Sequence, residues 1–162
     1  MLKKYFCCIL VIFLFLAGCK SSTVTPICEN LRFNANITYY NEQYLCPTEI
    51  TADGTITVKV SQPEILGGLT LTYLPDGSVS ATLGSIVYTP NSQNSYYVSI
   101  TDCMAAAFRD AKGQPIEANG DEIVFEGKFN SKPYRIYFTE RGIPLNMETG
   151  DIKIEFCDIS VF

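Results

Sequence analysis

Hydrophobic and polar residues alternate along many short segments of the chain, the pattern of β-strands with one buried face. The run from Leu31 to Tyr39 is the clearest case, because every second residue in it is apolar. Turn sequences such as Pro75-Asp76-Gly77 separate the runs, which predicts an antiparallel meander. In one run, Ile56, Val58 and Val60 are expected to face the core. The predicted strands cover residues 31–39, 44–50, 55–61, 69–73, 79–83, 86–88, 122–129, 134–139 and 151–156.

Between the two groups of strands, residues 95–112 follow a helical period instead. The apolar positions that share one helical face are Tyr97, Ile100, Met104, Phe108 and Ala111. Lys112 followed by Gly113 is typical of a helix end. The start is open, because residues 96–101 also fit a strand that leads to a shorter helix capped by Asp102. The pattern therefore predicts a mainly β domain with one helix.

The N-terminal segment predicts export from the cytoplasm. Lys3 and Lys4 precede an uncharged run from Tyr5 to Cys19, the layout of a signal peptide. This run is shorter than the roughly 20 apolar residues that cross a bilayer. Its last four residues, Leu16-Ala17-Gly18-Cys19, resemble the lipobox of bacterial lipoproteins. An ordinary signal peptide with a chance cysteine is the alternative.

The lipobox resemblance implies cleavage before Cys19 and acylation of its thiol, as with palmitate chains. We then expect residues 1–18 to be the signal peptide, residues 19–27 the lipidated cysteine and a tether, and residues 28–162 the folded domain. The protein would be lipid-anchored at the extracytoplasmic face of the cell membrane. Lys20 replaces the aspartate of the inner-membrane retention signal, which implies the outer membrane in a cell with two membranes.

Charge limits the partners of the domain. Removal of residues 1–18 takes away two of 12 basic residues and none of 17 acidic residues, so the net charge falls from −5 to −7. Such a surface argues against nucleic acid as a partner. The remaining expected partners are the membrane through Cys19, a lipid or acyl ligand, and a protein partner or second copy.

Four further cysteines, Cys28, Cys46, Cys103 and Cys157, lie in the predicted domain. Outside the cytoplasm an even number favours disulfides, with three pairings open, whereas a reducing habitat would leave four thiols. We expect neither metal nor cofactor, because the chain has no CxxC pair and no histidine. The lack of histidine and of nucleophile motifs also predicts that the protein is not an enzyme.

The order of elements is similar to that of a known family. Phe33-Asn-Ala-Asn-Ile-Thr-Tyr-Tyr, Gly54 to Val60, Gln62 to Tyr73 and Gly142-Ile-Pro-Leu resemble the LolA/LolB-like lipoprotein-carrier family, especially the short LolA-like lipoproteins of Gram-positive bacteria. The resemblance implies a curved antiparallel sheet, or incomplete β-barrel, with the helix packed on its concave side. It also implies that an apolar group such as an acyl chain is held in the concavity.

Two hypotheses for the function follow. In the first, an apolar ligand binds between the helix and the sheet, in a pocket formed by Leu71, Tyr73, Met104, Phe108, Phe125 and Phe138. In the second, the same residues form a closed core, and the protein is a structural or regulatory interaction lipoprotein that pairs as a homodimer through an open sheet edge.

Overall fold

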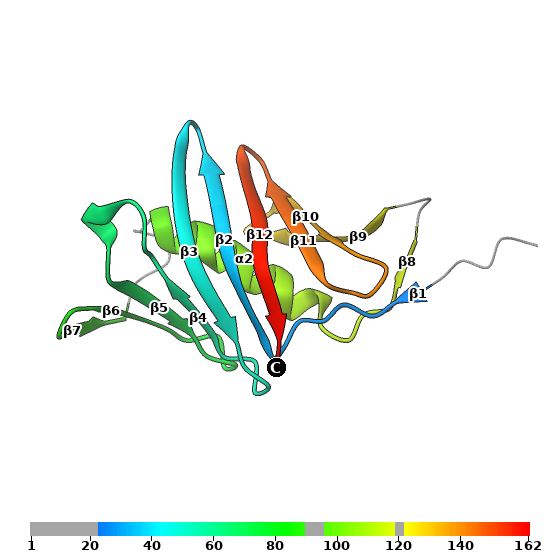
Figure 1. Ribbon diagram of the computed structural model, residues 1–162, viewed down its shortest axis with the longest axis horizontal. Coiled ribbons are helices and arrows are strands. Elements are labelled where there is room, and N and C mark those ends of the chain that lie inside the picture. Colours follow the sequence, from blue (N-terminus) through cyan, green and yellow to red (C-terminus); the bar gives the residue numbers. More distant parts are fainter. Residues whose placement is uncertain (1–22, 90–95, 119–121) are drawn as a thin grey trace, which may run out of the picture.

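The computed structural model describes residues 23–89, 96–118 and 122–162, which form one curved antiparallel sheet with a helix on its concave side (Figure 1). The sheet has ten strands in the order β7-β6-β5-β4-β3-β2-β12-β11-β10-β9 and is not closed into a barrel. The predicted fold class is therefore confirmed. The strands are β2 (Leu31–Tyr39), β3 (Glu42–Ile50), β4 (Ile56–Lys59), β5 (Leu69–Tyr73), β6 (Val79–Leu83), β7 (Ile86–Tyr88), β9 (Ile123–Phe129), β10 (Lys132–Phe138), β11 (Pro144–Thr149) and β12 (Ile152–Val161).

The first and last long strands lie side by side in the middle of the sheet. β12 pairs antiparallel with β2, and Ile154 lies opposite Ile37. The chain thus builds one flank from β2 to β7, crosses the concave face as a helix, and builds the other flank from β9 to β12. This route places the helix across the sheet it must cover.

The helix, α2 (Tyr96–Ala111), begins where the apolar period begins. The alternative of a strand over residues 96–101 is wrong, and Asp102 lies inside the helix. The side chain of Tyr97 lies outside the described residues. The predicted end is confirmed, because Gly113 adopts the left-handed conformation with φ of 71°, which a residue without Cβ reaches at little cost.

The inward faces of the strands match the alternation in the sequence. Ile56, Val58 and Val60 are all buried, as predicted. At the centre of the core, the Phe108 ring of α2 packs against both Phe33 of β2 and Phe156 of β12, with centroids 5.5 Å and 5.4 Å away. These three rings join the helix to both central strands.

The strand β11 was not predicted. Its inward residues include Pro144 and Thr149 as well as Met147, so apolar alternation is faint, and Leu145 points outward at 46 % exposure. Proline is tolerated there because it begins the strand. β12 also continues past the predicted end, through an irregular register after Cys157.

The segment expected to be a tether is partly folded. Residues 23 and 24 form β1 (Thr23–Val24), which pairs with β8 (Ile116–Glu117). Val24 and Pro26 are buried, and the Ile27 N–H donates to the Gly142 carbonyl at 2.8 Å. Residues 23–27, which were expected to belong to the tether, are therefore packed on the described domain. Residues 1–22, with the predicted signal peptide and Cys19, lie outside the described residues.

One further short element, a 3₁₀ turn labelled η1 (Glu64–Leu66), leads into β5. It holds Ile65 at 89 % exposure, which makes this side chain the most exposed of the large hydrophobic residues that the structure describes. Among residues 23–89, 96–118 and 122–162, no helix has the length and apolar character needed to cross a membrane.

Candidate functional site

The six residues of the predicted pocket all belong to elements that meet at the helix–sheet interface. Leu71 and Tyr73 come from β5 on one flank, and Phe125 and Phe138 from β9 and β10 on the other. Five of the six are buried, and Phe125 is half-buried. The members from α2, Met104 and Phe108, are 0 % and 1 % exposed, so the helix occupies the space between the flanks.

Little open volume remains at this interface. The cavity there measures about 20 Å³ and is bounded by Ile37, Tyr44, Cys46, Val60, Leu71, Ile100 and Thr101. Of the six predicted residues, only Leu71 contributes to it. A cavity of this size is close to the minimum that admits one water molecule, and ligand pockets usually measure about 300–1,000 Å³. With α2 in place, the centre of the concavity is a filled core.

A polar cluster lies inside this interface, where α2 meets the end of β5. The hydroxyl groups of Tyr73 and Thr101 are hydrogen-bonded to each other. Asp102 is 8 % exposed, and its Oδ1 atom has no hydrogen-bond partner. Arg109, two turns further along α2, donates from Nη2 to the Leu74 carbonyl at 2.8 Å, while its buried Nε is unpartnered.

The electrostatics of the cluster follow from burial. Desolvation raises the pKa of Asp102, whereas the hydrogen bond from Tyr73 and the charge of Arg109 act in the opposite direction. Desolvation also raises the pKa of Tyr73, with a contribution from the Asp102 charge. Sequence reasoning missed this cluster, although an acid and a base seven residues apart in a predicted helix share one face.

The four cysteines of the domain are free thiols. Cys46 and Cys103 are buried in the core, whereas Cys157 is half-buried. The Cys157 Sγ atom accepts a hydrogen bond from the Asn36 side-chain amide at 3.5 Å. Burial raises the pKa of the Cys28 and Cys46 thiols to about 12, and that of Cys103 to about 11. These thiols are protonated at neutral pH and are poor nucleophiles. The structure shows none of the predicted disulfides among these cysteines.

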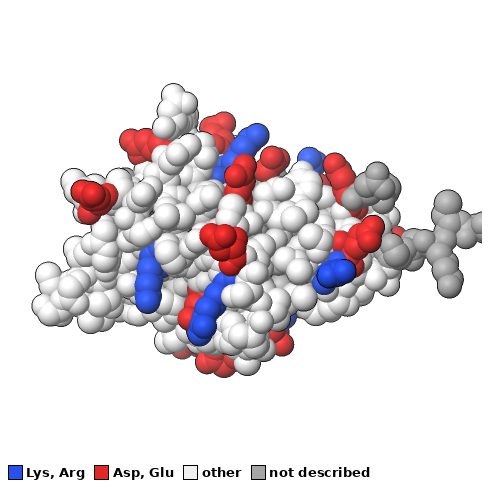
Figure 2. Space-filling model, viewed as in Figure 1, with Lys and Arg blue, Asp and Glu red and all other residues white. Residues whose placement is uncertain are grey.

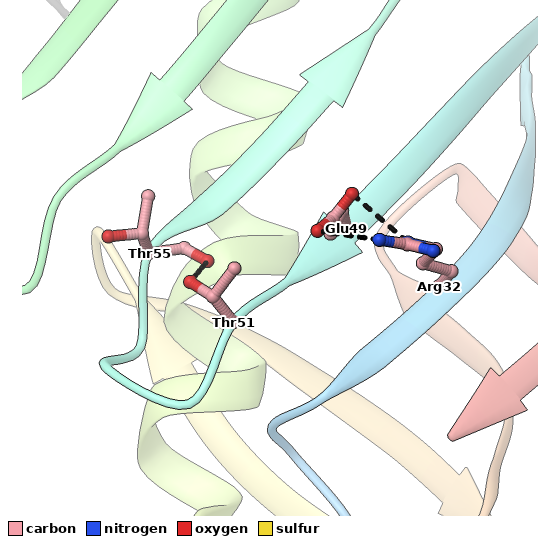
Figure 3. A network of polar contacts seen from close by, with 4 residues as sticks. All are labelled: Arg32, Glu49, Thr51 and Thr55. Atoms are coloured by element: carbon pink, nitrogen blue, oxygen red, sulfur yellow. Dashed lines mark hydrogen bonds and ion pairs between the residues drawn. The ribbon is translucent and has the colours of Figure 1, made fainter. Parts of the chain in front are cut away.

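A larger hollow, of about 380 Å³, lies on the convex face of the sheet. Its wall includes Arg32 and Glu49, whose side chains form two contacts of 3.1 Å and 3.3 Å (Figure 3). Beside them, the Thr51 hydroxyl donates to the Thr55 carbonyl at 3.1 Å. The Arg32 and Glu49 side chains are 59 % and 40 % exposed, so solvent screens the pair and its contribution to stability is small.

Charged side chains are dispersed over the surface. In the view of Figure 2, acidic and basic groups are both dispersed across the face. The end of the molecule formed by β6 and β7 shows almost no charge. Among the described residues, no group of three or more acidic, cysteine or histidine side chains is placed to hold a metal ion.

Comparisons with known proteins give only distant likenesses. No family model and no curated protein matches the chain. A structure of PNGF-II is 10 % identical with a TM-score of 0.40, and the match covers 82 % of this chain but 27 % of that chain. The LolA superfamily protein NE2245 from Nitrosomonas europaea is 7 % identical with a TM-score of 0.40, and the match covers 85 % of this chain and 89 % of that chain. The chain thus spans about a quarter of PNGF-II, and likenesses at this level assign it no activity.

Proposed function

We propose that the protein is a lipid-anchored, non-enzymatic interaction protein at the extracytoplasmic face of the membrane, with a core closed by its own helix. The observation that supports this most directly is the cavity of about 20 Å³ between α2 and the sheet. Because α2 already occupies the concavity, contact with a partner falls to the outer surfaces and edges of the sheet.

The edge strand β7 is the surface best suited to a protein partner. Ile86, Val87 and Tyr88 are 65 %, 67 % and 46 % exposed. From Leu69 to Thr89 the chain carries a single charged residue, Asp76. Proteins usually protect an open edge with charges, proline or a bulge, since unpaired N–H and C=O groups attract a further strand. An uncharged edge on an acidic protein also lets a second copy approach without charge repulsion.

The position of β1 supports this assignment. If Cys19 carries the lipid, three residues separate it from Thr23 of β1, and the four residue steps reach at most about 14 Å. β1 lies at one end of the long axis and β7 near the other (Figure 1). The apolar side chains of β7 are then remote from the anchored end. Since the edge has only three residues, its interface is small and its pairing transient.

The test is the oligomeric state of the full chain, purified from membranes in detergent and measured by light scattering over a range of concentrations. We expect a concentration-dependent dimer that Val87→Lys abolishes. Thr38→Lys is the matched control, because Thr38 is also exposed and uncharged but lies on a central strand. A monomer at every concentration, or equal loss of the dimer in both variants, would contradict pairing through β7.

The anchor is tested separately. We expect the mature chain to show the mass of an acylated Cys19 and to sediment with membranes, and Cys19→Ser to lose both properties. An unmodified Cys19 in a chain that leaves the membrane fraction would refute the anchor and leave the result for β7 standing.

A second function, binding of an acyl or other lipid-like ligand on the concave face, has one observation in its favour. Asp102 Oδ1 and Arg109 Nε are buried without hydrogen-bond partners where α2 meets β5. Unpaired buried polar atoms are unfavourable, so α2 is held less strongly here than at the aromatic cluster in the centre of the core. Displacement of α2 would expose the apolar concave face. Native mass spectrometry followed by organic extraction separates the two functions, because only the second predicts a lipid-sized adduct that extraction removes.

A further inference from the structure

The hollow of about 380 Å³ on the convex face, which we call the convex hollow, has balanced charges in its wall. The basic members are Arg32 and Lys59, and the acidic members are Glu49 and Asp158. Arg32 forms an ion pair with Glu49 at 3.1 Å (Figure 3). The Asn34 side-chain amide donates to the Asp158 carboxylate at 2.8 Å. Because the two charges of each sign cancel, the convex hollow favours a neutral polar ligand over a charged one.

Rows of hydroxyl groups continue from the convex hollow across the next strands of the sheet. Thr57 of β4 lines the hollow and lies opposite Thr72 of β5, which in turn lies opposite Ser80 of β6. In a second row, Thr70 of β5 lies opposite Thr82 of β6. All five side chains are half-buried. We call these five residues the hydroxyl face.

The hydroxyl face points outward and is uncharged. Leu71 and Ala81, which separate its members on β5 and β6, are both buried, so the hydroxyl groups on either side of them lie on the convex face. None of the five hydroxyl groups is hydrogen-bonded to another residue that the structure describes. Between Leu69 and Thr89 the chain carries only one charge, at Asp76. Hydroxyl groups both donate and accept hydrogen bonds, so this face matches a ligand that is itself covered with hydroxyl groups.

We propose that the convex hollow and the hydroxyl face together bind a neutral, extended polysaccharide with β-1,4 linkages. Neighbouring strands lie about 4.8 Å apart, and the sugar repeat of such a chain is close to this spacing. A chain that runs across the strands therefore places successive sugars over β2, β3, β4, β5 and β6, which are neighbours in the sheet. Rotation about the glycosidic bonds lets the chain follow the curve of the sheet.

The two parts of the site have different roles. The convex hollow lies within the range of about 300–1,000 Å³ that is usual for small-molecule pockets, so it can surround one sugar. The hydroxyl face supports the units that follow. The Pro47 ring in the hollow and the threonine methyl groups supply apolar contacts for the C–H groups of the sugars. The site is separate from the lipid anchor and from the β7 edge, since it uses none of their residues.

The test is calorimetric titration of the full chain in phosphatidylcholine nanodiscs, which contain no sugar. We expect cellopentaose, whose five units span β2 to β6, to bind at least about tenfold more tightly than cellobiose, because its three further units add hydrogen bonds. Maltopentaose has the same sugars in α-1,4 linkage and a coiled shape, so it should bind as weakly as cellobiose. No binding of cellopentaose at millimolar concentration, or equal affinity for the two pentaoses, would overturn the proposal.

Substitutions then locate the bound chain. Thr72→Val removes the central hydroxyl group of the longer row, and it should weaken cellopentaose binding about threefold to tenfold, as expected for the loss of one hydrogen bond. Valine has the shape and strand preference of threonine, so circular dichroism should show an unchanged fold. Thr57→Val should have the same effect at the junction with the hollow.

Thr38→Val is the matched control, because Thr38 is an exposed threonine of β2 outside both the convex hollow and the hydroxyl face. This variant should bind cellopentaose as the unchanged chain does. An unchanged affinity in Thr72→Val and Thr57→Val, or an equal loss of affinity in the control, would show that the chain does not lie on the hydroxyl face and would refute the site. The oligomeric state of the β7 variants is measured without sugar, so either result leaves the other standing.

Discussion

Replacement of Phe108 by alanine tests whether α2 is an integral part of the core. Phe108 is 1 % exposed, and its ring packs against Phe33 of β2 and Phe156 of β12. The substitution removes the ring that α2 contributes to the cluster and leaves the Phe33–Phe156 contact, with centroids 5.0 Å apart, in place. The effect therefore measures how firmly the helix is attached to the two central strands.

The magnitude follows from the burial of the ring. A phenylalanine-to-alanine change in a packed core costs about 3–5 kcal/mol, because transfer free energy is lost and a cavity remains. The two ring contacts place the expected value in the upper half of this range. For a domain of this length, each kcal/mol lowers the melting temperature by about 2–4 °C. We expect a decrease of the order of 10–20 °C.

Thermal and urea unfolding of the full chain, both followed by circular dichroism, are the appropriate assays, because the chain has no tryptophan. Phe162→Ala is the matched control. Phe162 is 54 % exposed, and its ring contacts the Arg32 guanidinium at 4.4 Å from the centroid, so its loss should cost less than about 1 kcal/mol.

A loss below about 1 kcal/mol for Phe108→Ala, equal to that of the control, would refute the filled core. The helix would then cover the concave face without contributing to stability, as expected of a displaceable element. A large loss with an unchanged urea dependence would confirm that α2 unfolds together with the sheet.

Three further predictions concern the polar cluster, one turn and the thiols. Because the pKa of Asp102 is raised above its unfolded value, the folded state binds the additional proton, so stability falls as pH rises from about 4 through the folded pKa. In urea titrations at several pH values, Asp102→Asn should abolish this decrease and be the more stable protein at neutral pH. In thermal unfolding, Gly142→Ala should cost about 2–4 kcal/mol, since φ is 76° and the added Cβ would lie 2.3 Å from the Thr25 carbonyl oxygen. Gly150→Ala is the control, because φ is 56° there but the added Cβ would meet open space, and it should cost about 1–2 kcal/mol. A neutral disulfide reagent should react slowly with Cys46 in the native protein and rapidly in urea, and fast native reaction would contradict the burial that raises its pKa to about 12.

Local pattern was sufficient to predict most of the elements. The bounds of β2, β5, β6 and β7 and the extent of α2 follow from apolar periodicity and turn residues, because each of these segments has one clearly apolar face. β11 was not predicted, because two of its inward positions are occupied by a proline and a threonine and its apolar alternation is therefore weak. The packing of Val24 and Pro26 was not predicted either, because a short polar segment has the composition of a linker. Only its pairing with β8, which is remote in sequence, shows that it is folded.

The candidate site was predictable only in part. The residues at the helix–sheet interface could be named from the sequence, because burial follows from the period of each element. Whether they enclose a pocket depends on shifts of a few ångströms in the position of α2, which no pattern encodes. The hollow of about 280 Å³ that is bounded by Tyr39, Phe129 and Ile152 was unpredictable for a related reason. Three hairpin ends that are remote in sequence enclose it, and their convergence depends on the order of the strands.

That order has a consequence for folding. The central pairing of β2 with β12 joins residues more than 100 positions apart, so the middle of the sheet is incomplete until the C-terminal strand is available. A chain that emerges N-terminus first exposes the apolar inner face of β2 to β7 and an unpaired β2 edge throughout its synthesis. Export of an unfolded chain through a membrane would postpone all pairing until β12 has arrived, whereas retention in the cytoplasm would leave that edge open to aggregation. A chain truncated before Ile152 should therefore fail to fold, and not fold into a smaller sheet, because it loses the strand that joins the two flanks. Protease digestion and circular dichroism of that truncated chain would decide the question, and a protease-resistant β2–β7 fragment would contradict the argument.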